Sequence, residues 1–236
     1  AALRISSLFP DAEFKPELVV CADVEQSRRD RAVNDFGFAR AVAGFEEAVS
    51  AKDVDAVWVT APNMLHVPMI AAAAAVGKAI FSEKPIGGTP AQTVEAYNIA
   101  KKHSTPTGVG YNYLWSPLVI HARELIKSGA IGRVTHYRGR FLSMYGSDEL
   151  GLLTWRFKFA QAGYGVTSDI LSHSVSLAHF LVGGISEVTG MKNNTITHRP
   201  LPTGAASHYG RGKATDPKGE VENEDFASML CNFENG

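Results

Sequence analysis

The sequence predicts an α/β fold for the first half of the chain and a second domain of different architecture for the rest. Short apolar runs of strand length recur between residues 18 and 111, and helical stretches separate them. This rhythm changes near Pro117. Buried strands that alternate with helices are typical of βαβ units around a parallel sheet. We therefore expect one domain over residues 1–114 and a second, α+β domain over residues 115–236.

The elements of the first half follow from local composition. Leu18–Ala22 is a continuous apolar run suited to a buried strand, and Asp23 ends it before a charged helical stretch. Gly77 ends one expected helix, and Thr89 with Pro90 provides the N-cap and first turn of the next. The remaining elements expected here are strands at 56–60, 79–81 and 107–111, with helices at about 65–76 and 90–103.

The second half combines helices with longer strands. A helix over about 117–128 precedes a turn at Gly129 and Gly132, and the alternation of residues 133–143 predicts a strand. A helix over about 169–181 is closed by Gly183-Gly184. Further strands are expected at 187–191, 195–199 and 225–233.

Composition excludes several classes of partner. The chain of 236 residues is 45% hydrophobic and has a formal charge of -1, so it offers no basic surface for nucleic acid. Its longest small-residue run, Ala71–Val76, is too short to cross a membrane. Two distant cysteines, Cys21 and Cys231, suit core thiols in a reducing compartment, which predicts a cytoplasmic location.

Both ends of the chain are expected to be truncated. A dinucleotide fold needs a first strand and a glycine-rich turn before a helix, and no such loop is visible. We expect residues 1–9 to be the first helix after that missing turn, and Asn235-Gly236 is a hairpin signal without a returning strand. Gly163-Tyr164-Gly165 resembles half of a dinucleotide fingerprint, but Ser168 stands at its sixth position and no buried strand precedes it. We interpret it as unrelated to dinucleotide binding.

Asp23 is the candidate for recognising the adenosine ribose. If residues 1–9 are the first helix, Asp23 ends the second strand, where a carboxylate accepts hydrogen bonds from ribose hydroxyls. This favours NAD over NADP, because the carboxylate repels a 2′-phosphate. A turn residue at a strand end explains Asp23 equally well, and Arg28 with Arg29 keeps NADP open.

Three residues form a set with catalytic chemistry. Lys84, within Glu83-Lys84-Pro85, follows an apolar strand, and Asp169 and His173 lie four residues apart at the start of a predicted helix. Residues at that spacing share one helix face. A lysine, an aspartate and a histidine can move a proton beside a bound cofactor, which indicates an enzyme. His173 and His179 lie on different helix faces without a cysteine, so no metal site is expected.

These motifs together resemble the Gfo/Idh/MocA oxidoreductases over nearly the whole chain. The residues that carry the resemblance are Thr60-Ala61-Pro62-Asn63 with His66, Phe81-Ser82-Glu83-Lys84-Pro85, Tyr111-Asn112-Tyr113, Trp155-Arg156-Phe157, Asp169 with His173, and Val221-Glu222-Asn223-Glu224-Asp225. The resemblance implies an N-terminal Rossmann dinucleotide-binding domain, followed by an α+β domain with a large, mostly antiparallel open sheet. It also implies a homo-oligomer, a dimer or tetramer, formed through that sheet.

The resemblance further implies a set of site residues. Those implied for the cofactor, NAD or NADP, are Asp23, Thr60, Pro62, Asn63, His66, Glu83, Lys84, Trp155 and Arg156. Those implied for the substrate are Lys84, Tyr111, Asn112, Asp169 and His173. Two alternatives stay open: Asn63 and His66 also suit a turn and a helix cap, and the aromatic residues around Arg156 also suit loop packing.

The activity implied is hydride transfer between a nicotinamide cofactor and a secondary alcohol of a sugar, sugar derivative or inositol. We assign His173 as the proton acceptor, with Asp169 orienting it or binding a substrate hydroxyl. Lys84 either stabilises the developing alkoxide or shares the proton transfer, so the identity of the base stays open. The alternatives are an NAD-dependent glycosidase that uses transient oxidation, and a non-catalytic dinucleotide-binding regulator.

The chain departs from the family pattern at three positions near these motifs. Leu171 stands where members often have glycine, Ser176 stands where a second aspartate is common, and Leu114 replaces a frequent arginine. Without that arginine a charged substrate group has less to bind to. Sugar or cyclitol hydroxyls therefore fit better than carboxylates.

Overall fold

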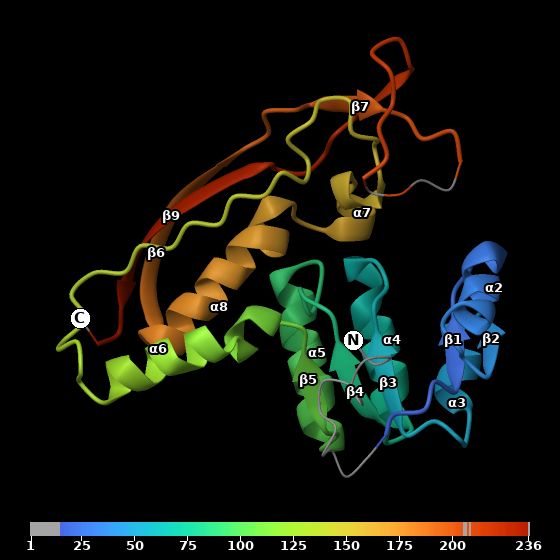
Figure 1. Ribbon diagram of the computed structural model, residues 1–236, viewed down its shortest axis with the longest axis horizontal. Helices are drawn as coiled ribbons and strands as arrows, with labels where there is room; N and C mark the ends of the chain where they lie inside the picture. The colour runs from blue at the N-terminus through green and yellow to red at the C-terminus, as the bar shows by residue number, and fades with distance from the viewer. Residues whose placement is uncertain (1–14, 205–206, 208, 236) are drawn as a thin grey trace. The chain divides into compact units, whose positions relative to one another are not determined.

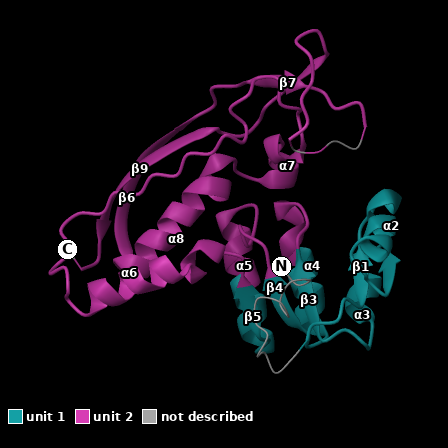
Figure 2. Ribbon diagram, viewed as in Figure 1, with its two compact units in different colours: residues 1–59, 68–81, 97–108 teal, residues 60–67, 82–96, 109–236 magenta. Residues whose placement is uncertain are grey.

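The structure, a computed structural model, describes residues 15–204, 207 and 209–235. These residues form two compact units (Figure 2), and the chain alternates between them along the sequence. Unit 1 takes the chain up to residue 59, then 68–81 and 97–108, and unit 2 takes 60–67, 82–96 and the chain from 109 onward. Because the units interleave in sequence, the expected domain boundary at residues 114 and 115 stays a prediction. The helix expected at residues 1–9 lies outside the described residues.

Unit 1 contains the βαβ arrangement that the sequence predicts (Figure 1). Strands β1 and β2 pair in parallel, and β3, β4 and β5 form a three-stranded sheet in that order. A helix joins β1 to β2, β3 to β4 and β4 to β5. The elements, of which α4, β4, α5 and β5 lie partly in unit 2, are β1 (Val20–Ala22), α2 (Gln26–Asn34), β2 (Arg40–Val42), α3 (Phe45–Ser50), β3 (Ala56–Val59), α4 (His66–Ala75), β4 (Ala79–Ser82), α5 (Pro90–His103) and β5 (Thr107–Val109).

The core of unit 1 lies between the three-stranded sheet and α4. Its buried side chains include Val59, Ile70, Ala73, Ala74 and Ile80. The small alanines let the helix backbone approach the strands closely, because little side-chain volume separates them. The helix stops at Gly77, whose φ of 72° is left-handed and therefore suits glycine. The helix stop expected from the sequence is confirmed.

Unit 2 combines helices with antiparallel strand pairs, which confirms the second architecture. Strand β6 pairs with β9, and β7 pairs with β8; Figure 1 shows β6 and β9 running together as one long ribbon. The elements are η2 (Asn63–Leu65), η3 (Asn112–Trp115), α6 (Pro117–Lys127), η4 (Trp155–Phe157), α7 (Phe159–Ala162), the π-helical turn η5 (Thr167–Leu171), α8 (Ser172–Leu181), β6 (Ile185–Asn193), β7 (His198–Pro200), β8 (Lys218–Glu220) and β9 (Phe226–Phe233).

The strand expected at residues 133–143 is wrong. The segment has no regular secondary structure, and no described strand pairs with it. Its aromatic side chains hold it instead: the Tyr137 ring contacts Phe233 at 6.3 Å between centroids, and the Phe141 ring contacts Tyr113 at 5.5 Å. Alternating side chains specify two faces of an extended segment, but a strand also needs a backbone partner.

The strand expected at residues 195–199 is only partly correct. The structure places β7 at His198–Pro200, shifted toward the C-terminus. The backbone amides of Thr195 and Ile196 donate to the carboxylate of Asp225, each at 2.8 Å. The Asp225 side chain therefore accepts the backbone hydrogen bonds that a neighbouring strand would otherwise accept.

Three features of the described residues relate to the composition of the chain. Cys21 and Cys231 are both free thiols. Among the helices described, none combines the length and apolar character needed to cross a membrane. Within residues 15–204, 207 and 209–235, no group of three or more histidine, cysteine and acidic side chains is arranged to hold a metal ion.

Candidate active site

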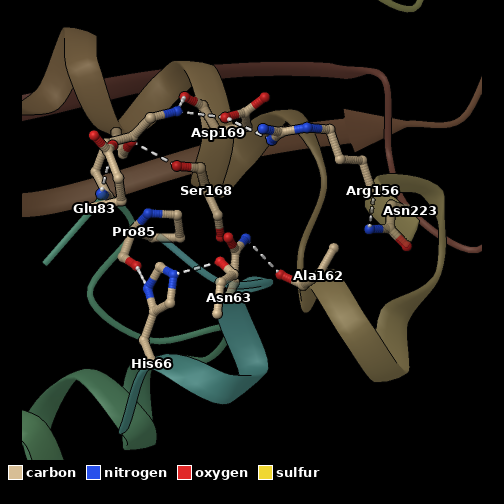
Figure 3. Close-up of polar contacts among 12 residues, drawn as sticks. Asn63, His66, Glu83, Pro85, Arg156, Ala162, Ser168, Asp169 and Asn223 are labelled. Carbon is tan, nitrogen blue, oxygen red and sulfur yellow. Dashed lines mark hydrogen bonds and ion pairs between the residues drawn. The ribbon is translucent and has the colours of Figure 1, made fainter. Parts of the chain in front are cut away.

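Lys84 and Asp169 form the polar centre of unit 2. Lys84 follows β4 and precedes Pro85 across a cis peptide bond, and Asp169 lies on η5. The Lys84 ammonium donates to the Asp169 carboxylate and, at 3.1 Å, to the Asp169 main-chain carbonyl. Both side chains are half-buried. The structure thus brings these two candidate residues into contact, while their catalytic roles stay a prediction; Figure 3 draws the polar contacts around them.

Arg156 places a second cation beside the same carboxylate. Its Nη1 lies 3.7 Å from Asp169 Oδ1, and its guanidinium lies over the Trp155 ring at 4.7 Å. Arg156 and Asp169 both line a cavity of about 70 Å³ within unit 2. Two cations therefore lie beside one carboxylate. The contact of Trp155 and Arg156 with a cofactor stays a prediction.

His173 lies in the first turn of α8, one helical turn after Asp169. It is only 5% exposed, and the rings of Tyr111, Tyr113 and Phe141 surround its imidazole. Burial lowers the pKa of His173, the positive charge of Lys84 lowers it further, and Asp169 opposes the shift. The imidazole is therefore neutral at neutral pH, and a neutral imidazole can accept a proton.

Asn63 and His66 hold the loop that carries Lys84. His66 is 1% exposed, with Nδ1 2.8 Å from the carbonyl of Pro85 and Nε2 2.7 Å from the carbonyl of Ala61. Asn63 Nδ2 donates to the carbonyl of Ala162 at 2.9 Å. These buried contacts give both side chains a structural role (Figure 3). Their predicted contact with a cofactor stays a prediction.

The other expected site residues of unit 2 lie around the same loops. Thr60 is exposed after β3, and Pro62 precedes η2. Glu83 accepts the Lys84 backbone N–H at 3.3 Å, while Asn112 is exposed in η3. Burial raises the pKa of Tyr111, which a hydrogen bond with the Ser172 side chain partly offsets. Tyr111 is thus a neutral hydroxyl beside His173.

Asp23 lies in unit 1, directly after β1. Its Oδ1 accepts the backbone N–H of Glu25 at 2.9 Å, and Arg28 lies 3.6 Å from Oδ2. Arg29 donates to the main-chain carbonyl of Asp23 at 2.6 Å rather than to its carboxylate. A carboxylate with remaining lone pairs at the end of a parallel strand fits the ribose hydroxyls of a dinucleotide. The residues present therefore fit the adenosine half of NAD.

The loop at residues 221–225 positions the site, a role that the sequence analysis missed. Asn223 Nδ2 donates to the carbonyls of Arg156 and Gly163, at 3.0 and 2.9 Å. The Glu224 carboxylate accepts the backbone N–H of Thr167 at 3.2 Å, at the start of the turn that carries Asp169. One loop thus holds both segments that supply charged groups. Its motif was visible, but only the folded chain shows what it contacts.

The glycines of Gly163-Tyr164-Gly165 serve close backbone packing. A Cβ on Gly163 would lie 1.8 Å from the carbonyl oxygen of Gly88, and one on Gly165 would lie 2.2 Å from the carbonyl oxygen of Glu224. Gly163 also has a φ of 71°. Only glycine allows these approaches. This turn therefore packs directly against the loop that follows Lys84.

Comparison with known proteins places the fold in a class and the chain in a family. Residues 3–111 match the model of an oxidoreductase family with an NAD-binding Rossmann fold, and residues 119–236 match the model of the GFO/IDH/MocA C-terminal domain. The chain thus combines an NAD-binding Rossmann domain with an α/β domain that contains antiparallel strands. It belongs to the Gfo/Idh/MocA oxidoreductase family.

Individual relatives agree with this assignment. The chain is 34% identical over 226 residues to a levoglucosan dehydrogenase of Pseudarthrobacter phenanthrenivorans. The matched stretch covers 95% of this chain and 55% of the relative. It is 26% identical over 174 residues to a D-xylose dehydrogenase of Paenarthrobacter nicotinovorans, covering 72% of this chain and 44% of the relative. The chain therefore spans about half the length of these curated relatives.

A solved structure gives the same result. A levoglucosan dehydrogenase in complex with NADH and L-sorbose superposes with a TM-score of 0.91 at 30% sequence identity, and the match covers 100% of this chain and 61% of that one. A TM-score this high means that the two proteins share their fold. The Rossmann fold expected from the sequence is confirmed.

Proposed function

We propose that the protein is an NAD(P)-dependent dehydrogenase that oxidises a secondary alcohol of a sugar, sugar derivative or inositol. The observation that carries the proposal is the contact between the Lys84 ammonium and Asp169, one helical turn before the neutral imidazole of His173. Alcohol oxidation needs a group that stabilises negative charge on oxygen and a base that removes the hydroxyl proton. Lys84 and His173 are suited to these two tasks.

Each residue has a distinct role in the oxidative direction. A ring nitrogen of His173 accepts the hydroxyl proton, the carbon–oxygen bond becomes double, and the hydrogen on carbon leaves with its electron pair. NAD, when bound, supplies the acceptor for that hydride. Lys84 Nζ donates a hydrogen bond to the substrate oxygen while Asp169 holds the ammonium in place. His173 is the favoured base because Lys84 already donates to Asp169.

NAD is the cofactor that Asp23 supports. Its carboxylate attracts ribose hydroxyls and repels a 2′-phosphate, although Arg28 beside it keeps NADP as the alternative. Towards the nicotinamide half, the proposed contacts come from the loops that carry Lys84 and Trp155. The full proposed set there is Thr60, Pro62, Asn63, His66, Glu83, Lys84, Trp155 and Arg156.

The substrate is proposed to be an uncharged polyol. Leu114 removes a cation that could bind a carboxylate, and Tyr111 and Asn112 offer neutral polar groups near His173. The similarity to a levoglucosan dehydrogenase and to a D-xylose dehydrogenase supports a sugar as the substrate. We therefore place levoglucosan, D-xylose and inositols first among candidate substrates.

A homo-oligomer formed through the β6–β9 strand pair is part of the proposal. Met191 and Leu230 lie on the same face of this strand pair and expose most of their side chains. Contiguous exposed apolar side chains often mark protein interfaces. Light scattering of the protein tests this directly, and a monomer at all concentrations would contradict it. The cytoplasmic location expected from the two cysteines stays a prediction.

The test of the proposed function is absorbance at the reduced-nicotinamide band. The protein is incubated with NAD or NADP and with levoglucosan, D-xylose or inositols. We expect reduced cofactor to accumulate with at least one sugar. This accumulation should be abolished in His173→Asn but retained in His179→Asn, because His179 is an exposed histidine on the same helix. No turnover with either cofactor across the panel would overturn the proposal. Release of a free sugar without net reduced cofactor would favour the glycosidase alternative.

A further inference from the structure

Three aromatic rings enclose the imidazole of His173. Phe141 stacks on it with ring centroids 5.9 Å apart and planes 20° apart. Tyr113 and Tyr111 meet it nearly edge-on, at 4.9 and 5.7 Å with interplanar angles of 81° and 85°. Tyr113 also contacts Phe141 at 5.5 Å, so the rings support one another. We call these three residues the aromatic cage. Offset stacked and edge-to-face contacts at these distances are favourable.

Within the part of the chain that the structure describes, no acidic side chain is hydrogen-bonded to this imidazole. A catalytic histidine is commonly held by a hydrogen bond that the N–H of its second ring nitrogen donates to a carboxylate. Asp169 is the carboxylate one turn away, but it is engaged by Lys84 and faces Arg156. Among the residues that the structure describes, none makes a hydrogen bond to the His173 ring, and only the charges of Lys84 and Asp169 act on it from a distance.

We propose that Phe141, Tyr113 and Tyr111 are positioning residues that fix the plane of the His173 imidazole in place of a carboxylate partner. The proposal rests on the proposed function, in which His173 is the proton acceptor. Phe141 contributes the stacked face and so limits rotation of the ring about its side-chain bonds. Both ring nitrogens then remain available, because no side chain or carbonyl of the described residues is hydrogen-bonded to either of them. The base can take a proton from a substrate hydroxyl without first breaking a hydrogen bond.

The cage also determines the charge state of the base. Burial lowers the pKa of His173, Lys84 from the loop after β4 lowers it further, and Asp169 from η5 raises it. Tyr111 and Tyr113 are the other titratable groups that face the ring. The base therefore stays neutral even at pH values somewhat below the ordinary histidine pKa of about 6.5, and kcat/KM keeps its value there. Activity is lost only when the pH falls through the lowered pKa.

Removing the stacked ring should undo this effect. In Phe141→Ala, water reaches the imidazole, so the pKa of His173 rises toward its ordinary value and the acidic limb of kcat/KM moves to higher pH. Turnover should fall about 10-fold or more, because a loosely held base samples unproductive orientations. Phe141→Tyr keeps a flat ring at the position and should restore both properties. Leu142→Ala is the matched control, since Leu142 is the next residue and is 79% exposed.

The experiment is an NMR titration of the histidine imidazoles together with the pH profile of kcat/KM. The His173 signal is assigned by its loss in His173→Asn. We expect wild type, Phe141→Tyr and Leu142→Ala to share a low pKa, and Phe141→Ala to titrate at higher pH. If Phe141→Ala does not fold, Phe141→Leu replaces it and should lose turnover while keeping wild-type thermal stability. A wild-type titration and pH profile in the folded Phe141→Ala or Phe141→Leu variant would overturn the proposal.

The two proposals fail in different ways. The titration needs no substrate, so a shifted His173 in Phe141→Ala without turnover on any sugar would reject the dehydrogenase function and leave the aromatic cage intact. Turnover on a sugar with an unshifted His173 in Phe141→Ala would reject the cage and leave the dehydrogenase function intact.

Discussion

The Lys84 ammonium is hydrogen-bonded to both the carboxylate and the main-chain carbonyl of Asp169, although the two residues are 85 positions apart. The carbonyl contact does not depend on the aspartate side chain. Substitution of Asp169 therefore changes the charge beside Lys84 more than the position of Lys84. This separation allows the electrostatic contribution to be tested apart from folding.

Asp169→Asn should reduce kcat by about 100-fold, because the amide leaves the Lys84 charge unbalanced at the reacting centre. The free energy of unfolding should change by no more than about 1 kcal/mol, since both partners are half-buried. Steady-state kinetics and denaturant unfolding measure the two effects. Asp55→Asn, an exposed aspartate in unit 1, is the control. Wild-type turnover in Asp169→Asn would remove Asp169 from the site.

Gly163→Ala should strongly destabilise unit 2. Both Gly163 and Gly129 have positive φ, 71° and 75°, but only Gly163 has a neighbour within reach of a new Cβ. Gly129→Ala therefore measures backbone strain alone, which we expect to cost about 1–2 kcal/mol. Gly163→Ala adds a collision with the Gly88 carbonyl. The free energy of unfolding should therefore fall by several kcal/mol more than in Gly129→Ala, an effect on the order of that seen when a core is overpacked. Equal unfolding midpoints in urea for the two variants would contradict the close packing.

Asn223→Ala should destabilise the protein and loosen the site. Asn223 is 2% exposed, and its loss leaves the carbonyls of Arg156 and Gly163 without their donor. An unsatisfied buried group costs about 1–3 kcal/mol. Asn232→Ala removes an exposed amide that bonds Glu187, and should have a much smaller effect. Matching denaturation curves for the two variants would show that the 221–225 loop does not hold these segments.

Asp23→Ser should change cofactor preference. Hydrogen bonds to a charged group contribute about 1.5–3 kcal/mol, so the ratio of kcat/KM for NAD to that for NADP should fall by about 10-fold or more. Asp35→Ser, at the far end of α2, should leave the ratio unchanged. The ratio is obtained from initial rates with each cofactor. An unaltered ratio in Asp23→Ser would assign Asp23 to the turn alone.

Much of the fold could be predicted because its signals are local. The apolar run at β1, the glycine stop after α4 and the Thr89-Pro90 start of α5 each act within a few residues. The failures involve distant partners. Residues 133–143 alternate like a strand but have no described ladder partner, and Thr195 with Ile196 bonds to Asp225 instead of to a neighbouring strand.

The candidate site shows the same limit. Lys84, Asp169 and His173 could be selected because their residue types and order match a family pattern. The residues that hold them could not, because Phe141 and Asn223 act through contacts formed only in the folded chain. An isolated phenylalanine or asparagine carries no spacing signal for such a role. The nitrogens of His66 lie within hydrogen-bond distance of two backbone carbonyls, and these contacts likewise could not be predicted from the sequence around it.

The central claim is that Lys84 and His173 act on the same reacting alcohol. A double-mutant cycle in kcat with wild type, Lys84→Met, His173→Asn and the double variant tests it most directly. Each single variant should lose about 10²- to 10⁴-fold, and the double variant should lose little more than the worse single one, because residues that act as a unit are strongly non-additive. Losses that multiply in the double variant, or near wild-type turnover in either single variant, would contradict the account.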